Sequence, residues 1–121
     1  MTPEEKQLLL VDLCARQPYG VKISVDDDNL FIPRLKYIDG LICHFYECAW
    51  TKYFDEIKPY LRSPENLNDE EKDYWHKLQR GLKLGGNIDF MIDFYHSHYI
   101  DYRGLIPMGI ALEAPKNMYN N

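Results

Sequence analysis

Apolar and polar residues follow two different spacings along the chain, which divide it into a helical start, a β-rich centre and a helical end. Over residues 3–16, apolar residues recur three and four positions apart, the spacing of one buried helix face. Thr2 and Glu5 form the sequence pattern of a capping box, which begins a helix. Pro18 and Gly20 end the helix, because proline cannot continue the hydrogen-bond ladder and glycine allows a turn.

The central part of the chain carries the period-two pattern of half-buried strands. Asp39-Gly40 is a strong hairpin signal, since aspartate followed by glycine suits a tight two-residue turn. Pro33 cannot donate a ladder hydrogen bond, so it places its strand at a sheet edge or marks a bulge. Strands are predicted over residues 21–25, 30–38 and 41–46, with a turn at 26–29 and a further short strand near Ile57.

After this centre the pattern becomes helical again. Residues 58–65 contain two prolines and are predicted to be an extended connector. A helix then begins at Asn68, whose side chain can cap it, and ends at Gly85-Gly86. Residues 88–99 form a further amphipathic helix. The apolar residues 105–114 are interrupted by proline and glycine, so an irregular or short strand-like piece is expected there.

These elements predict one α+β domain over residues 1–121. A small antiparallel sheet of three to four strands, which could curl toward a barrel, is flanked by an N-terminal helix and two C-terminal helices. A polar and mobile tail is expected from about residue 115.

Tyrosine is the unusual feature of the composition, with ten residues beside two tryptophans and five phenylalanines. Tyrosine pairs a large ring with a polar hydroxyl, so it suits both the closure of a small core and a contact surface. The formal net charge of −5 argues against direct nucleic-acid binding, which usually needs a basic stripe. The same charge fits a partner with a basic surface, although solubility alone also explains it.

The N-terminus and the cysteines indicate a compartment. The first residues are acidic and polar where a signal peptide would be basic, and no apolar run is long enough to span a bilayer. The three cysteines are odd in number, which favours reduced thiols. We therefore expect a cytosolic protein with no membrane contact.

The best candidate metal ligands are Asp89, Asp93 and His96, which share one face of a helix. The same spacing is equally typical of a solvated helix face, and no second ligand pair accompanies it. Cys43 and Cys48 are spaced too loosely for an ordinary zinc site. No cofactor is expected.

The connector carries the most suggestive surface residues. Lys58, Tyr60 and Arg62 place two cations and a ring on a segment stiffened by proline, which would lose little entropy on binding. The alternative is that Tyr60 pins the connector to the core while both cations are solvated.

Several segments resemble one group of proteins. The matching pieces are residues 8–22 (LLLVDLCARQPYGVK), 58–62 (KPYLR), 101–106 (DYRGLI), 109–115 (GIALEAP) and Met118-Tyr119, about a third of the chain. They are similar to small uncharacterised proteins encoded by phages and prophages of gut Bacteroidales bacteria. That group continues the connector with Pro-Met and a serine-rich piece, where this chain has Ser-Pro-Glu-Asn at residues 63–66.

The resemblance implies a provenance and a shared fold rather than a reaction. Because small phage accessory proteins often act by stoichiometric binding, our first hypothesis is a non-enzymatic interaction protein, an inhibitor of a host or anti-phage defence protein. The alternatives are a binder of nucleotide-like signals, for which a homo-oligomer would be expected, and a metal-dependent enzyme. The predicted contact residues are Lys58, Tyr60, Arg62, Tyr102 and Arg103.

Overall fold

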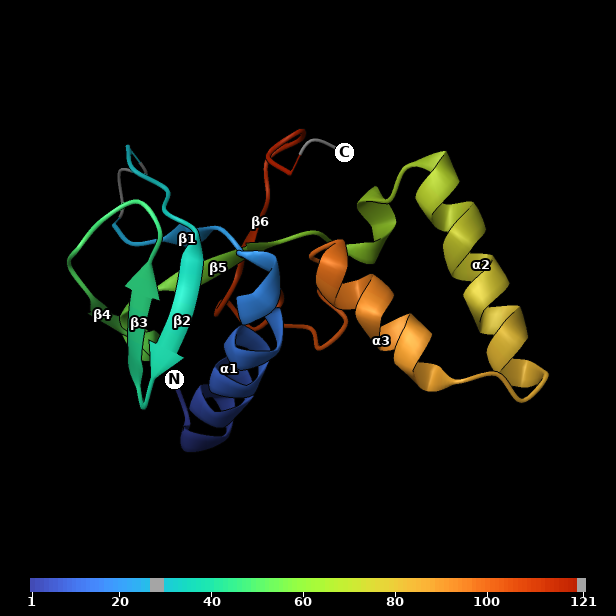
Figure 1. Ribbon diagram of the computed structural model, residues 1–121, viewed down its shortest axis with the longest axis horizontal. Helices are drawn as coiled ribbons and strands as arrows, with labels where there is room; N and C mark the ends of the chain where they lie inside the picture. The colour runs from blue at the N-terminus through green and yellow to red at the C-terminus, as the bar shows by residue number, and fades with distance from the viewer. Residues whose placement is uncertain (27–29, 120–121) are drawn as a thin grey trace.

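A computed structural model of the protein describes residues 1–26 and 30–119 (Figure 1). The α-helices of the described residues are α1 (Pro3–Arg16), α2 (Asp69–Lys83) and α3 (Ile88–Ser97), and short 3-10 helices are η1 (Gln17–Tyr19), η2 (Phe54–Glu56) and η3 (Pro64–Asn66). The strands are β1 (Ile23–Ser24), β2 (Leu35–Asp39), β3 (Ile42–Phe45), β4 (Lys52–Tyr53), β5 (Lys58–Leu61) and β6 (Leu112–Glu113). This confirms the predicted α+β class, with one helix before the strands β1–β5 and two after them.

The strands form two three-stranded sheets, and these do not close into a barrel. One sheet has the order β2-β3-β4 and is antiparallel throughout. The other has the order β1-β5-β6, in which β1 pairs antiparallel and β6 pairs parallel with β5. An isolated antiparallel bridge between Lys22 and Arg34 connects the β1 and β2 sides of the two sheets.

The predicted hairpin joins β2 to β3 at Asp39-Gly40, where Gly40 has the positive φ of 64° that a glycine adopts without strain. The second predicted strand, however, begins only at Leu35. Pro33 precedes it, and a bulge follows between Leu35 and Tyr37. The turn predicted at residues 26–29 falls mostly on residues 27–29, outside the described residues.

The predicted connector is a strand instead of a linker. β5 is the central strand of its sheet, with Ile23 of β1 opposite Pro59 and Leu112 of β6 opposite Tyr60. Pro59 suits the extended backbone of β5, and the buried side chains of Pro59, Tyr60 and Leu61 draw the strand into the interior, whereas Pro64 begins η3.

The hydrophobic core lies between α1 and the two sheets. Leu9 and Leu13 are about one helical turn apart, so they share one face of α1. That face packs against the core, and both residues are fully buried. They pack in one cluster with buried residues of the strands and of the C-terminal segment, among them Val21, Ile23, Leu35, Cys43, Phe45, Leu61, Leu105 and Ile110.

The segment predicted as a polar tail packs onto the body as far as it is described. The Tyr119 hydroxyl accepts a hydrogen bond from the Lys22 N–H at 2.9 Å and donates one to the Tyr60 carbonyl at 2.7 Å. Its ring stacks on Tyr99 with centroids 3.7 Å apart. The C-terminal segment is thereby attached to Lys22, the residue before β1, and to Tyr60 of β5.

Candidate binding surfaces

Two of the predicted contact residues, Tyr60 of β5 and Arg62 directly after it, lie inside the molecule. Tyr60 is 5% exposed and Arg62 is 7% exposed, whereas Lys58 is exposed. Residues 59–62 are buried on both faces of the chain, because β5 is flanked by β1 and β6 and is contacted by the C-terminal segment, whereas Lys58 lies at the exposed start of the strand.

The Arg62 guanidinium forms a two-pronged ion pair with Glu71, the third residue of α2. Its two terminal nitrogens donate to the two carboxylate oxygens at 2.7 and 2.6 Å, and one of them also donates to the His98 carbonyl at 3.1 Å. Burial alone would raise the pKa of Glu71, but hydrogen bonds from Arg62 and Asn68 and the charge of Arg62 together lower it. Arg62 therefore anchors the start of α2 to β5.

Tyr102 and Arg103 lie in a second buried cluster, on the side of α1. Asp12 accepts from Arg16 at 2.8 Å and from Arg103 at 3.1 Å, and both Asp12 and Arg16 are completely buried. The Tyr102 ring lies beside the Arg16 and Arg103 guanidinium groups, and its hydroxyl shares a 2.7 Å hydrogen bond with His96. Both residues remain partly exposed, so they border the surface while holding this network together.

The candidate metal ligands separate along α3. Asp89 and Asp93 are exposed, whereas His96 is buried and bonded to Tyr102. Helix α3 begins far from α1 and approaches it only toward its C-terminal end (Figure 1). The two aspartates near its start are therefore solvated, while His96 near its end is buried. Among residues 1–26 and 30–119, no group of three or more histidine, cysteine or acidic side chains could hold a metal ion.

The cysteines are free thiols in the structure. Cys43 lies in the core, where burial, with a smaller effect of Cys14, raises the pKa of its thiol to about 12. A thiol that stays protonated is a poor nucleophile and a poor metal ligand.

The sheet β2-β3-β4 presents an exposed aromatic surface that the sequence interpretation missed. The bulge after Leu35 shifts the side-chain alternation, so Leu35 points inward opposite Phe45 while Tyr37 points outward opposite His44. The two outward rings stack with centroids 4.2 Å apart. Tyr37, Ile42, His44 and Tyr53 point outward from the sheet, and together with Tyr46, which follows β3, they form what we call the aromatic face; exposed Asp39, opposite Ile42, lies on the same side.

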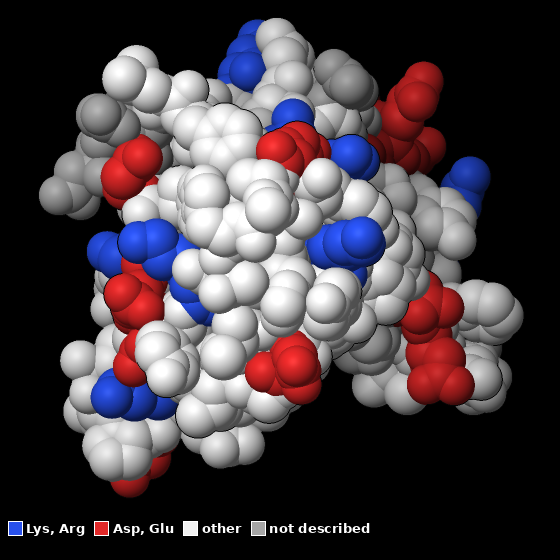
Figure 2. Space-filling view, turned by 60° about the vertical axis from the view of Figure 1, so that its left-hand side comes forward, with Lys and Arg blue, Asp and Glu red and all other residues white. Residues whose placement is uncertain are grey.

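Three tyrosines of the aromatic face are largely open to solvent, with Tyr37, Tyr46 and Tyr53 exposed by 41%, 53% and 56%. Two cations flank Tyr46, since the Arg34 guanidinium carbon and the Lys36 ammonium lie 4.9 and 5.8 Å from its ring centroid. Figure 2, which brings this side of the molecule forward, shows a broad uncharged surface with charged groups around it. The surface thus combines apolar area with positive charge at one margin.

One signal in the sequence could have found this surface. Pro33, which predicts a sheet edge or a bulge, lies just before the bulge that turns Tyr37 outward. Assigning faces from that bulge would have placed Tyr37, His44 and Tyr46 together.

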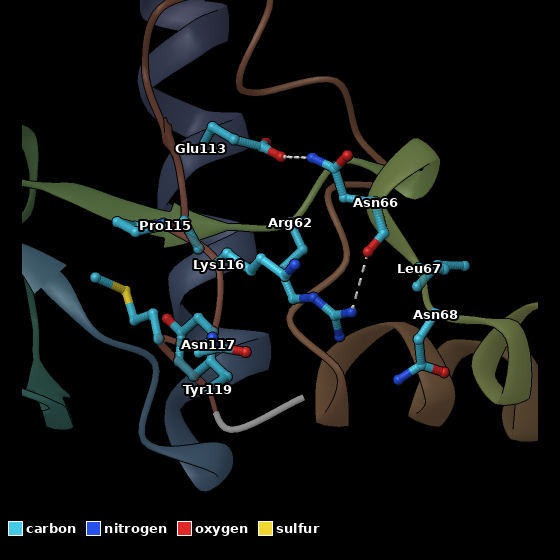
Figure 3. A pocket seen from close by; sticks show the side chains of 11 residues that line it. Arg62, Asn66, Leu67, Asn68, Glu113, Pro115, Lys116, Asn117 and Tyr119 are labelled. Carbon is cyan, nitrogen blue, oxygen red and sulfur yellow. Dashed lines mark hydrogen bonds between the residues drawn. The ribbon is translucent and has the colours of Figure 1, made fainter.

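A cavity of about 480 Å³ lies between the C-terminal segment and the residues before α2 (Figure 3). Glu113 spans one side of it, accepting hydrogen bonds from the Ser63 backbone and hydroxyl groups and from the Asn66 amide. The side chains of Arg62, Asn66 and Glu113 are therefore already engaged with other groups of the chain. The remaining lining is formed by Leu67, Asn68, Ala114, Pro115, Lys116, Asn117, Met118 and Tyr119.

Comparison with known proteins adds no relative: no family model, no curated protein and no solved structure matches this chain. In the described residues, none of the helices combines the length and the apolar character needed to cross a membrane.

Proposed function

We propose that this protein is a non-enzymatic interaction protein that binds another protein through the aromatic face of the β2-β3-β4 sheet. The carrying observation is the set of solvent-exposed tyrosines on one side of a sheet whose other side is core. Tyrosines are enriched where protein partners meet, because a stiff ring gives a large contact area and its hydroxyl a hydrogen bond.

The chemistry of the aromatic face favours a partner surface that combines apolar side chains with carboxylates. Tyr37 and Tyr53 offer ring area, while Lys36 beside Tyr46 is exposed and available to an acidic group. The resemblance to phage and prophage proteins adds the expectation that the partner is a host or anti-phage defence protein in the bacterial cytosol.

The partner should be sought with a variant that removes the aromatic area and leaves the core intact. We expect Tyr37→Ser, Tyr46→Ser and Tyr53→Ser combined to lower partner capture at least about tenfold, because exposed aromatic anchors contribute most of an interface's energy. The measurement is quantitative mass spectrometry of proteins that co-purify, in a fixed ratio, with tagged protein from a Bacteroidales host.

A matched control changes exposed apolar residues elsewhere. Val11→Ser with Met108→Ser removes two side chains of similar exposure outside the aromatic face and should leave capture unchanged. Equal capture by the tyrosine variant and the wild type, or the same loss with the control, would contradict the proposal.

A further inference from the structure

The cavity between the C-terminal segment and the residues before α2 has the size of a small-molecule site. Its volume of about 480 Å³ lies within the range of about 300 to 1,000 Å³ that is usual for ligand pockets. Arg62 and residues 66–68 form one wall, and residues 113–119 form the other (Figure 3). A ligand between these walls would contact two parts of the chain that are far apart in sequence.

The carboxylate that lines this cavity has no acceptor capacity to spare. Oε1 of Glu113 accepts from the Ser63 N–H and from the Asn66 amide, and Oε2 accepts from the Ser63 N–H and hydroxyl. These four contacts occupy the lone-pair positions of the carboxylate. Glu113 therefore joins the two walls and leaves little for the hydrogen-bond donors of a ligand.

The positive charge of the lining is only partly neutralised. The Arg62 guanidinium is paired with Glu71. Lys116, on the opposite wall, is exposed and forms no ion pair within residues 1–26 and 30–119. Its ammonium group is therefore available to an anion.

Two side-chain amides add further donors, one from each wall. The Asn68 Oδ1 caps α2 by accepting from the Glu71 N–H at 2.8 Å, which leaves its NH2 group to donate. Figure 3 shows the Asn68 nitrogen on the side that faces the C-terminal segment, where Asn117 lies. Within the described part of the chain, neither this NH2 group nor the Asn117 side chain has a hydrogen-bond partner.

The cavity also has an apolar part. Leu67, which is 5% exposed, lines one wall, and Pro115 and Met118 line the other. Apolar lining with a few converging polar groups is typical of small-molecule sites, because burial supplies affinity and the polar groups fix the orientation. The available polar groups here are mainly donors, so the complementary ligand is rich in acceptors.

We propose that this cavity binds a small organic anion. Its carboxylate or phosphate head group is held by the ammonium group of Lys116 and by the amides of Asn68 and Asn117, since charge-assisted hydrogen bonds are the strong ones. Its apolar body lies against the apolar side chains of the two walls. This binding is separate from the proposed protein contact, because the cavity shares no residue with the aromatic face.

The test is isothermal titration calorimetry at low salt with three probes that share one six-carbon chain. Hexanoate and hexyl phosphate carry the two candidate head groups, and hexylammonium carries the opposite charge. At least one of the two anions should bind with a Kd at least about tenfold below that of hexylammonium. The tighter of the two anions then identifies the head group.

Two variants locate the head group. Lys116→Gln should raise the Kd about tenfold, because it removes a charge-assisted hydrogen bond. Asn117→Gly should raise it by about threefold to tenfold, and glycine adopts the positive φ of 70° at this position without strain. Lys58→Gln is the matched control: this exposed lysine lies outside the cavity, so the Kd should not change.

Nuclear magnetic resonance of the wild type gives a readout that does not depend on any variant. The side-chain amide signals of Asn68 and Asn117 should shift as the anion is added. The proposal would be overturned if neither anion binds, if hexylammonium binds as tightly, or if Lys116→Gln keeps the wild-type Kd. The variant without the three tyrosines of the aromatic face should still bind the anion, so the two proposals can fail separately.

Discussion

Two buried arginines, Arg16 and Arg62, connect parts of the chain that are far apart in sequence. Arg16 donates to Asp12 and to the carbonyls of Tyr95 and Ile100, while Arg62 donates to Glu71 and the His98 carbonyl. A guanidinium group can satisfy several acceptors at once, which is what makes its burial tolerable. Both arginines thus connect the body of the protein to α3 and the residues that follow it.

Removal of the Glu71 carboxylate should destabilise the protein strongly. We expect Glu71→Ala to lower the free energy of unfolding by about 3 kcal/mol, because it leaves the buried Arg62 charge without its counter-ion. Urea denaturation measures this. Glu47→Ala is the control: it breaks the more exposed pair with Arg34 and should cost less than about 1 kcal/mol. Equal costs for the two variants would contradict a structural role for the Arg62–Glu71 pair.

His96 should make the stability depend on pH near neutrality. Burial first, and then the Arg16 charge, lower the pKa of His96, although Asp12 opposes this; Arg103 lowers it further and Asp93 raises it. The unfolded chain takes up a proton near pH 6.5, while the folded protein resists it until lower pH. The thermal midpoint should therefore fall as the pH drops below about 6.5.

A comparison with His96→Gln isolates this effect by differential scanning fluorimetry between about pH 5 and 7.5. The variant should lose less of its thermal midpoint over this range. His76→Gln, at an exposed position of α2, should keep the wild-type slope. If His96→Gln and the wild type have the same slope, His96 does not control the dependence.

At the scale of elements, pairing decides which residues face outward. β2 is kept in register with β3 by four residue pairs, and the bulge lets Leu35 enter the core while Tyr37 leaves it. A strand without the bulge would turn Leu35 and Tyr37 to the same side. The aromatic face is thus a property of two paired strands and not of either strand alone.

The C-terminal segment depends on the Tyr119 hydroxyl. We expect Tyr119→Phe to lower the free energy of unfolding by about 1 to 3 kcal/mol, because the Lys22 N–H and the Tyr60 carbonyl each lose a partner. Thermal unfolding measures the loss. Tyr53→Phe, on the exposed aromatic face, is the matched control and should change the midpoint little. An unchanged midpoint for Tyr119→Phe would show that the segment is not held by this hydroxyl.

At the scale of the whole molecule, the aromatic face and helix α2 lie at opposite ends. The sheet β2-β3-β4 and helix α2 are separated by α1, the β1-β5-β6 sheet and α3 (Figure 1). The cavity beside β6 lies between these ends and has its own lining, so it is separate from the aromatic face.

The sequence by itself determined the local features. The capping box of Thr2 and Glu5, the cap at Asn68 and the turn at Asp39-Gly40 are all present, because each depends on residues a few positions apart. The amphipathic spacing of α1 likewise predicted the burial of Leu9 and Leu13, but Cys14, which shares that spacing, is exposed, and Asp12 and Arg16 on the other side are buried. These elements were enough to give the α+β class.

Only the tertiary structure decided which side chains are accessible. Arg62 appeared in sequence as a cation on a stiff connector, and its burial depends on Glu71 and on β6, which lies some fifty residues further along the chain. Tyr37 became exposed through the bulge and its pairing with β3. Burial is a sum over contacts between distant segments, and local spacing carries no information about those partners.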